Sequence, residues 1–232
     1  MSTTTGPKTS SVEVQVSKEV VPASSGQSGQ GWLLILMVFV AGAVSLSIEI
    51  AASRLLTPYF GSTQLVWATI IGLILLYLTV GYYVGGLLSD CYPRPHMLYS
   101  ITTIAAFFII LIPFIGGPIL HWAQVTFSAD TTGVFYGSLC AVIALFAIPT
   151  ILLGCVSPYA IRLRVIQIGK TGHVAGMLYA ISTAGSILGT FLPVLVLLPD
   201  LGTKQTFIVS GVILLLCSII GLLVKEHPAY PL

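Results

Sequence analysis

The stretch WLLILMVFVAGAVSLSIEIAASRL, residues Trp32–Leu55, decides the class of this protein. It is apolar over most of its length and exceeds the roughly 20 residues that a helix needs to cross the hydrocarbon layer of a bilayer. A secretory signal has a basic start and a shorter apolar core, so this stretch predicts a membrane span instead. It also carries a carboxylate, Glu49, and a guanidinium, Arg54, in its second half.

Five later stretches have the same character. They run over about Gln64–Leu88, Met97–Ile115, Val134–Val156, Val174–Leu198 and Thr206–Val224. Clusters of proline and glycine are expected to end the spans, because proline removes a backbone donor and clashes with the preceding turn. These clusters are Pro58 with Gly61, Gly116 to Pro118, Pro158, and Pro199 with Gly202. Residues 119–131 hold too few apolar side chains for another crossing, so we predict an all-α transmembrane bundle of about six spans.

The composition supports the same class. Of the 232 residues, 56% are hydrophobic and only 7% are charged, whereas a soluble domain has about 25% charged residues. So few charges cannot cover a water-facing surface of this size, and the mean hydropathy is +1.02. The net charge of +2 and the lack of a basic cluster among aromatic residues argue against nucleic-acid binding.

The distribution of basic residues predicts the topology. Residues 1–31 are rich in Ser, Thr, Gly and Gln and are expected to form a flexible cytoplasmic tail. The transmembrane domain is expected to cover 32–225, followed by a short cytoplasmic tail over 226–232. With the N-terminus inside, only Arg54 and Lys204 fall outside, and the positive-inside rule favours this orientation in the cell membrane, the inner membrane if bacterial. The cytoplasmic basic residues are Lys8, Lys18, Arg94, Arg162, Arg164, Lys170 and Lys225.

Small residues four apart are expected to form flat packing faces, since helices in lipid associate through close contact. Gly81 and Gly85 supply such a face on the second span, and Gly185 and Gly189 supply one on the fifth. Ser182 and Ser186 extend the face of the fifth span. Gly42 and Ser45 lie on the first span.

Glu49 is the candidate substrate or proton site. Ser45 and Ser53 lie four residues to either side and share its helix face, which gives the first span a polar stripe. A carboxylate at this depth costs a few kcal/mol if it faces lipid, so it is protonated, paired or turned inward. One interpretation is a site for a proton, a cation or a polyamine. The other is a hydrogen-bonded clamp between helices.

Three further charges predict a structural latch. Asp90 and Arg94 close the second span after Gly85 and Gly86, where a carboxylate and a guanidinium tie adjoining helix ends together. This segment resembles the loop between the second and third spans of major facilitator transporters. Arg54 is about 140° around the helix from Glu49, so it is expected to reach the outer interface or to pair with another helix.

A short amphipathic helix is predicted after Pro158. Arg162, Arg164 and Lys170 alternate there with apolar residues at helical spacing, which is typical of a helix on the membrane surface. Attraction to anionic lipid is one role for this surface, and docking of a partner protein is the other.

The sequence lacks the usual motifs of soluble catalysis and metal binding. It has no P-loop, GxGxxG, GxSxG or HExxH pattern. Its four cysteines and four histidines show no metal-ligand spacing, so no metal and no cofactor are expected. Catalysis by this chain alone is therefore not expected.

Several segments together resemble the membrane domain of fused major facilitator/spermidine synthase-like proteins. The resemblance covers about residues 32–224, and its fold is half of a twelve-span facilitator. Such proteins usually continue into an aminopropyltransferase-like domain, whose motifs this sequence lacks. The segments are Ser47-Ile48-Glu49, Arg54, Pro58–Ser62, Trp67, Gly81–Asp90, Leu153–Pro158, Gly176–Thr190, Pro199 and Leu201-Gly202-Thr203.

Three functions follow. The resemblance implies an integral membrane scaffold or anchor subunit that works with a partner chain. The alternative is a transporter module for a polyamine or other small cation, with Glu49 as the buried carboxylate. An integral-membrane enzyme is the weakest of the three. The expected partners are membrane lipids and either a second copy of the chain or another protein subunit.

Overall fold

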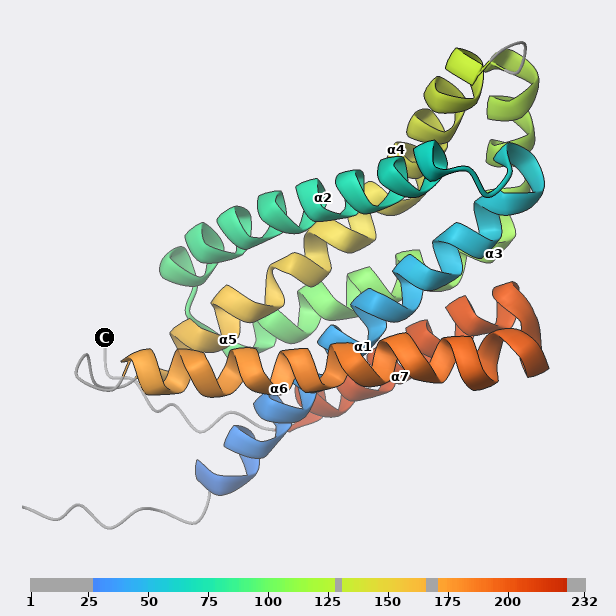
Figure 1. The fold of residues 1–232 in the computed structure, drawn as a ribbon. Coiled ribbons are helices and arrows are strands. Elements are labelled where there is room, and N and C mark those ends of the chain that lie inside the picture. The colour runs from blue at the N-terminus through green and yellow to red at the C-terminus, as the bar shows by residue number, and fades with distance from the viewer. Residues whose placement is uncertain (1–26, 128–130, 166–170, 225–232) are drawn as a thin grey trace, which may run out of the picture.

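The computed structural model describes residues 27–127, 131–165 and 171–224, and all secondary structure in these ranges is helical (Figure 1). The prediction of an all-α protein is confirmed. The helices are α1 (Gln27–Phe60), α2 (Gln64–Cys91), α3 (Pro95–Phe127), α4 (Thr131–Gly154), α5 (Val156–Arg164), α6 (Thr171–Leu192), the π-helix η2 (Pro193–Leu201) and α7 (Gly202–Leu223).

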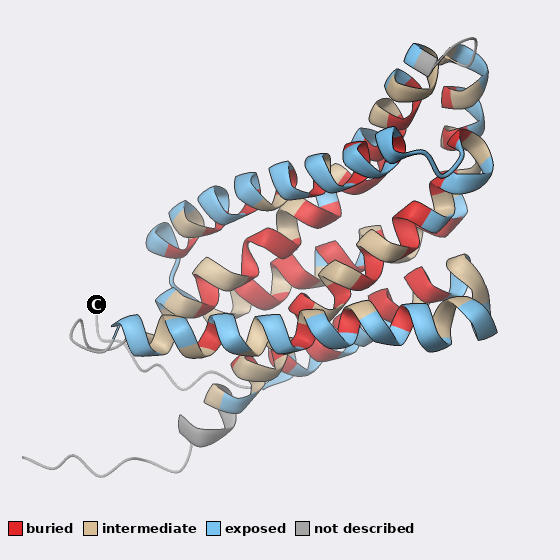
Figure 2. Ribbon diagram, in the orientation of Figure 1, coloured by how far each residue is buried: buried red, intermediate tan, exposed pale blue. Residues whose placement is uncertain are grey.

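Within the described ranges, five helical stretches are long and apolar enough to cross a membrane. The fourth, Thr132–Arg164, contains α4 and α5, and the fifth, Thr171–Leu223, covers 53 residues and contains α6, η2 and α7. Large apolar side chains cover the outside of the bundle, such as Leu75, Phe114 and Leu195. Buried positions line the inner sides of the helices (Figure 2). The chain therefore has the character of a multi-pass membrane protein.

The turn at Gly61, which was expected to end the first span, separates α1, which ends at Phe60, from α2, which begins at Gln64. Gly61 has a positive φ of 76°, a conformation that favours glycine, and Thr63 accepts from the Val66 amide to cap α2. Pro58 lies inside the last turn of α1 and does not end it. We call this end of the bundle the Gly61 end and the opposite one the Asp90 end.

The expected end of the third span at Gly116 to Pro118 is wrong. The helix α3 continues through Pro113 and Pro118 to Phe127, so residues 119–127 are helical. Leu120 and Ala123 are fully buried there. Their packing stabilises the extra turns and offsets the backbone hydrogen bonds that the prolines remove.

Two other expected helix ends also move. The helix α4 ends at Gly154 instead of Pro158, and Pro158 lies inside α5. The expected fifth span continues as a π-helix from Pro193 and contains Pro199. It ends at Gly202, whose φ is 81°.

Two pairs of parallel helices form the framework. In one pair, Gly81 and Gly85 of α2 lie against Ile151 of α4 and Cys155 at the α4–α5 junction. The residue numbers rise together along both helices, so the helices run in the same direction. Because α1 and α2 form a hairpin through a short turn, α1 runs opposite to α4.

In the other pair, Gly185 and Gly189 of α6 lie against Phe39 and Ala43 of α1. A Cβ atom on any of the four glycines in these pairs would clash with the backbone of the partner helix. The predicted glycine packing faces on α2 and α6 are therefore confirmed.

The order of packing repeats along the chain. The helix α1 packs on α6 and α7, as α4 packs on α2 and α3, and α3 packs on α7. If the triplet of α1, α2 and α3 is exchanged with the triplet of α4, α6 and α7, in that order, the same list of contacts results. Because α1 and α4 run in opposite directions, the two triplets are inverted relative to one another. In Figure 1, α2 and α6 lie on opposite sides of the central helices.

Candidate functional site

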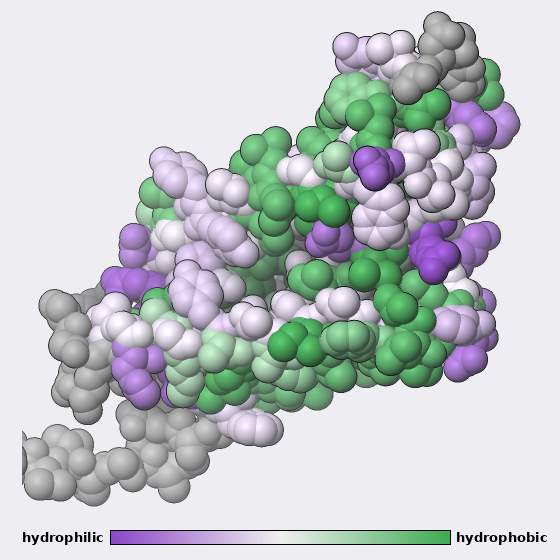
Figure 3. All heavy atoms as spheres, in the orientation of Figure 1, coloured by the Kyte–Doolittle hydropathy of each residue, from purple (hydrophilic) through white to green (hydrophobic). Residues whose placement is uncertain are grey.

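A polar pocket lies where α1, α2, the α4–α5 junction and α6 approach one another, and it contains about 90 Å³ of space. Serines and one tyrosine supply its polar groups, in contrast to the apolar outside of the bundle. Figure 3 shows this face of the molecule hollowed between α2 and α6, with hydrophilic side chains in places along the hollow. The polar residues at the pocket are Ser45, Tyr82, Ser157, Ser182 and Ser186.

The pocket sits at the close approach of α1 and α6. The Ser186 hydroxyl donates to the Gly42 carbonyl, 3.2 Å away, and a side chain on Gly42 would clash with the Ser182 carbonyl. Small residues therefore do two things here: they bring the backbones together and they leave hydroxyl groups around a space.

Glu49 lies one helical turn from this pocket toward the Gly61 end. Ser45 and Leu46 line the pocket, and residues three and four apart stack on one helix face. Glu49 is half-buried, and no other described residue makes a hydrogen bond or ion pair with it. Burial of a carboxylate in an apolar bundle costs free energy unless hydrogen bonds or an opposite charge compensate it, and the described chain supplies neither to Glu49.

The predicted stripe of Ser45, Glu49 and Ser53 divides into two parts. Ser45 reaches the pocket, whereas Ser53 is buried and donates to the Ile50 carbonyl of its own helix, at 2.8 Å. Arg54 is exposed, and no described residue forms an ion pair with it. Ser45 and Glu49 thus remain the candidate site on α1.

The Asp90 end carries a different ion pair from the one proposed from the sequence. Arg162 Nε lies 2.9 Å from Asp90 Oδ1, so α5 is joined to the end of α2. Within the described ranges, neither Arg94 nor Arg54 pairs with Asp90. The Tyr159 hydroxyl donates to the carbonyls of Tyr92 and Arg94, so the α2–α3 connection is held through its backbone.

The predicted amphipathic helix is α5, which ends at Arg164. Arg162 is exposed, whereas Arg164 Nη2 donates to the Gly31 carbonyl of α1 at 2.7 Å. Arg164 therefore ties α5 to α1, and Arg162 is the one of the two that faces outward. Lys170 lies outside the described residues.

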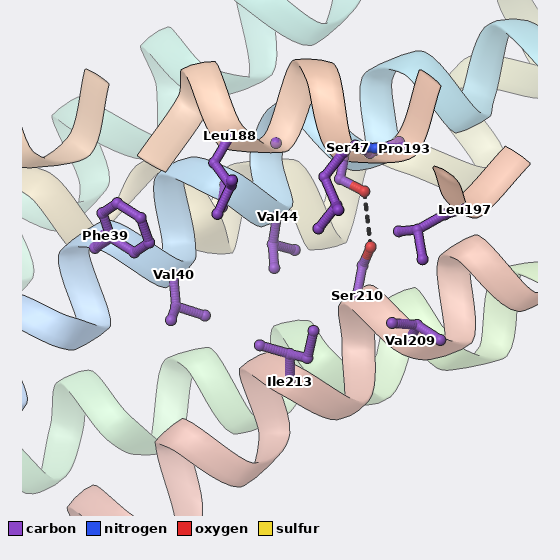
Figure 4. Close-up of a pocket in the computed structure, with 13 residues that line it drawn as sticks. Phe39, Val40, Val44, Ser47, Leu188, Pro193, Leu197, Val209, Ser210 and Ile213 are labelled. Carbon is purple, nitrogen blue, oxygen red and sulfur yellow. Dashed lines mark hydrogen bonds between the residues drawn. The ribbon is translucent and has the colours of Figure 1, made fainter. Parts of the chain in front are cut away.

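A second cavity, of about 110 Å³, lies between α1, α6, η2 and α7 (Figure 4). Its lining is apolar except for Ser47 and Ser210, whose hydroxyl oxygens are 2.8 Å apart. Both serines are buried, and their hydrogen bond joins α1 to α7. The shared hydrogen bond leaves neither hydroxyl without a partner, so we assign this pair to packing.

Sequence reasoning missed Thr150 and Ser157, which no spacing pattern on their own helix singles out. Thr150 is fully buried in α4, and its hydroxyl has no hydrogen-bond partner in the described structure. Ser157 follows the α4–α5 junction, whose position the sequence pattern did not predict. Within the described residues, no three His, Cys, Asp or Glu side chains gather in a way that could hold a metal ion.

The chain matches no protein-family model, no curated protein sequence and no solved structure.

Proposed function

We propose that this chain is a transporter module for a small cation and that Glu49 is the cation's charge partner. The unpaired carboxylate beside a pocket of hydroxyl groups is the observation that carries this proposal. Ionisable groups inside a membrane bundle are costly, and they are typical of ion and substrate pathways.

The inverted packing order supports the same function. Inverted triplets with a polar site between them are common in secondary transporters, where one repeat moves against the other. Here the pocket draws residues from both triplets, α1 and α2 from the first and α4 and α6 from the second. Counted this way, α1, α2, α3, α4, α6 and α7 provide six crossings, with both termini in the cytoplasm and the Asp90 end facing it.

The hollow between α2 and α6 is open on one side, so a second helical unit is needed to shield the cation from lipid. A second copy of this chain or another subunit supplies that cover in the proposal. The resemblance to the membrane part of fused major facilitator/spermidine synthase-like proteins supports a half-facilitator of this kind.

Cation uptake into liposomes that contain the purified chain tests the proposal. We expect Glu49→Gln, which keeps the shape of the side chain and removes its charge, to abolish uptake of monoamines, polyamines and protons alike. Thr79→Val is the matched control, because Thr79 is exposed on α2 and donates to its own helix. Uptake that survives Glu49→Gln would contradict the transport mechanism.

A membrane anchor or scaffold for a partner enzyme is the second candidate. The contacts of Tyr159, Arg162 and Arg164 favour it, because they fasten α1, α2 and α5 together at one end and leave Arg162 and Asp90 on the surface. A soluble protein that co-purifies in mild detergent and is lost in Asp90→Lys would support this function. A chain that purifies alone and transports would exclude it.

A further inference from the structure

Thr150 differs from the other buried threonines of the described structure. Thr69, Thr102 and Thr206 each donate to the carbonyl four residues earlier in their own helix, which is a common way to satisfy a hydroxyl in a membrane helix. Thr150 is equally buried, but its hydroxyl makes no hydrogen bond. Both its donor and its acceptor capacity are therefore unused in a place where an unpaired polar group is costly.

Thr150 and Glu49 do not line the polar pocket, but each lies about one helical turn from a residue that does. Leu153 and Ser45 both line that pocket. Thr150 is three residues before Leu153, and Glu49 is four residues after Ser45, so each stacks on the face of its helix that meets the pocket. Because the two helices run in opposite directions, both side chains lie about 5 Å beyond the pocket, toward the Gly61 end.

We propose that Thr150 is the hydrogen-bond partner of the Glu49 carboxyl group, through one bridging water, and that the cation handled here is a proton. This inference rests on the proposed transport function. The neighbouring polar pocket, whose lining includes neither Thr150 nor Glu49, has room for water, whose share of liquid volume is about 30 Å³ per molecule. A water bridge also satisfies Thr150, which no side chain of the described protein does.

A threonine hydroxyl suits both protonation states of a carboxyl group, since it can donate as well as accept. When Glu49 is ionised, the bridging water donates to the carboxylate and accepts from Thr150. When a hydronium ion in the pocket transfers a proton to Glu49, water is left behind. The new carboxyl O–H then donates to the bridging water, which donates to Thr150. Release to water on the other side reverses the same step.

The other ionisable groups near this site are few. Tyr82 of α2 lines the pocket, and Tyr77 of α2, Cys155 at the α4–α5 junction and Tyr179 of α6 lie within three residues of other positions that line it. Arg54 is five residues further along α1, about 7.5 Å along the helix axis. The remaining charged side chains of the described residues lie toward the ends of the bundle, and they are Asp90, Arg94, Arg162, Arg164, Asp200 and Lys204.

Infrared difference spectroscopy of the whole chain in lipid nanodiscs tests the inference without a transport assay. We expect a carbonyl band of a protonated carboxyl group that titrates with pH and disappears in Glu49→Gln. Thr150→Val is expected to shift this band to higher frequency, because the acid loses its hydrogen-bonded water. Thr150→Ser is expected to restore it, and Thr206→Val, at a satisfied threonine, is expected to leave it in place.

The outcomes separate this inference from the proposed function. A band that is identical in wild type and Thr150→Val, in samples with unchanged helix content, would overturn the role of Thr150. If the chain shows no titrating Glu49 band but still takes up an organic amine, the inference that the cation is a proton is wrong. The proposed transport function then stands. If the band shifts in Thr150→Val but the chain transports no cation, the hydrogen bond between Thr150 and Glu49 is supported. The proposed transport function is then contradicted.

Discussion

Asp90 at the end of α2 and Arg162 on α5 form an ion pair with 2.9 Å between Oδ1 and Nε, across 72 positions of sequence. Both side chains are well exposed, 71% and 49% respectively. An exposed pair of this kind contributes about 0–1 kcal/mol. We therefore expect Asp90→Asn to lower the thermal unfolding temperature in detergent by little, and less still at high salt.

A charge exchange tests whether the pair itself matters. The double variant with Asp90→Arg and Arg162→Asp is expected to regain the stability that either single change loses. A double variant no better than the sum of the single variants would show that the two side chains act independently.

Gly81 and Gly72 lie on the same helix and should respond in opposite ways to a larger side chain. A Cβ on Gly81 would meet the Ile151 carbonyl of α4, whereas a Cβ on Gly72 would meet nothing within 4 Å. We expect Gly81→Leu to destabilise the protein by about 3 kcal/mol or more, because the clash is with backbone. Gly72→Leu is expected to be neutral in the same unfolding measurement. Equal effects at the two positions would contradict the close packing of α2 on α4.

The hydrogen bond between Ser47 and Ser210 is suited to a double-mutant cycle. Single changes to alanine are expected to destabilise the protein, and the pair is expected to show a coupling of about 0.6 kcal/mol, the average for such bonds in a membrane protein. Unfolding in a mixed detergent system measures all four proteins. A coupling near zero would show that the two hydroxyls do not depend on one another.

Cys91 offers a test of the orientation. It is exposed beside Asp90, while Cys155 and Cys217 are buried. If the Asp90 end faces the cytoplasm, a membrane-impermeant maleimide should label Cys91 only after the cells are opened. Cys91→Ser is the control for reaction at the partly buried Cys140. Labelling of Cys91 in intact cells would reverse the proposed topology.

Most of the helix positions follow from the sequence because lipid requires long apolar stretches and internal backbone hydrogen bonds. The ends were harder to predict. Pro118 and Pro199 are strong breakers in water, but here burial of Leu120 and the continuation into a π-helix keep the chain helical. Among the described residues, the glycines with positive φ, Gly61 and Gly202, lie at helix boundaries, and Pro93 lies in the break between α2 and α3.

The candidate site was predictable in part. Glu49 stands out in any apolar run, and its spacing from Ser45 places both on one helix face. Its surroundings come from α2, α4, α5 and α6, and no periodicity within α1 contains that information. The partner of Asp90 was missed for the same reason, since Arg162 is distant in sequence and its neighbours suggested a free surface helix.

The pairing of α1 with α6 sets a condition on how the protein is made. The hydrogen bond from Ser186 to Gly42 joins residues 144 positions apart, so the ribosome delivers α1 to the bilayer long before its main partner exists. Until then the small-residue face of α1 has only lipid against it, which offers poor contact to so flat a surface. Final assembly therefore waits for the last third of the chain. In a nascent protein arrested after α4, α1 would have formed only a minority of the contacts that it makes in the complete structure.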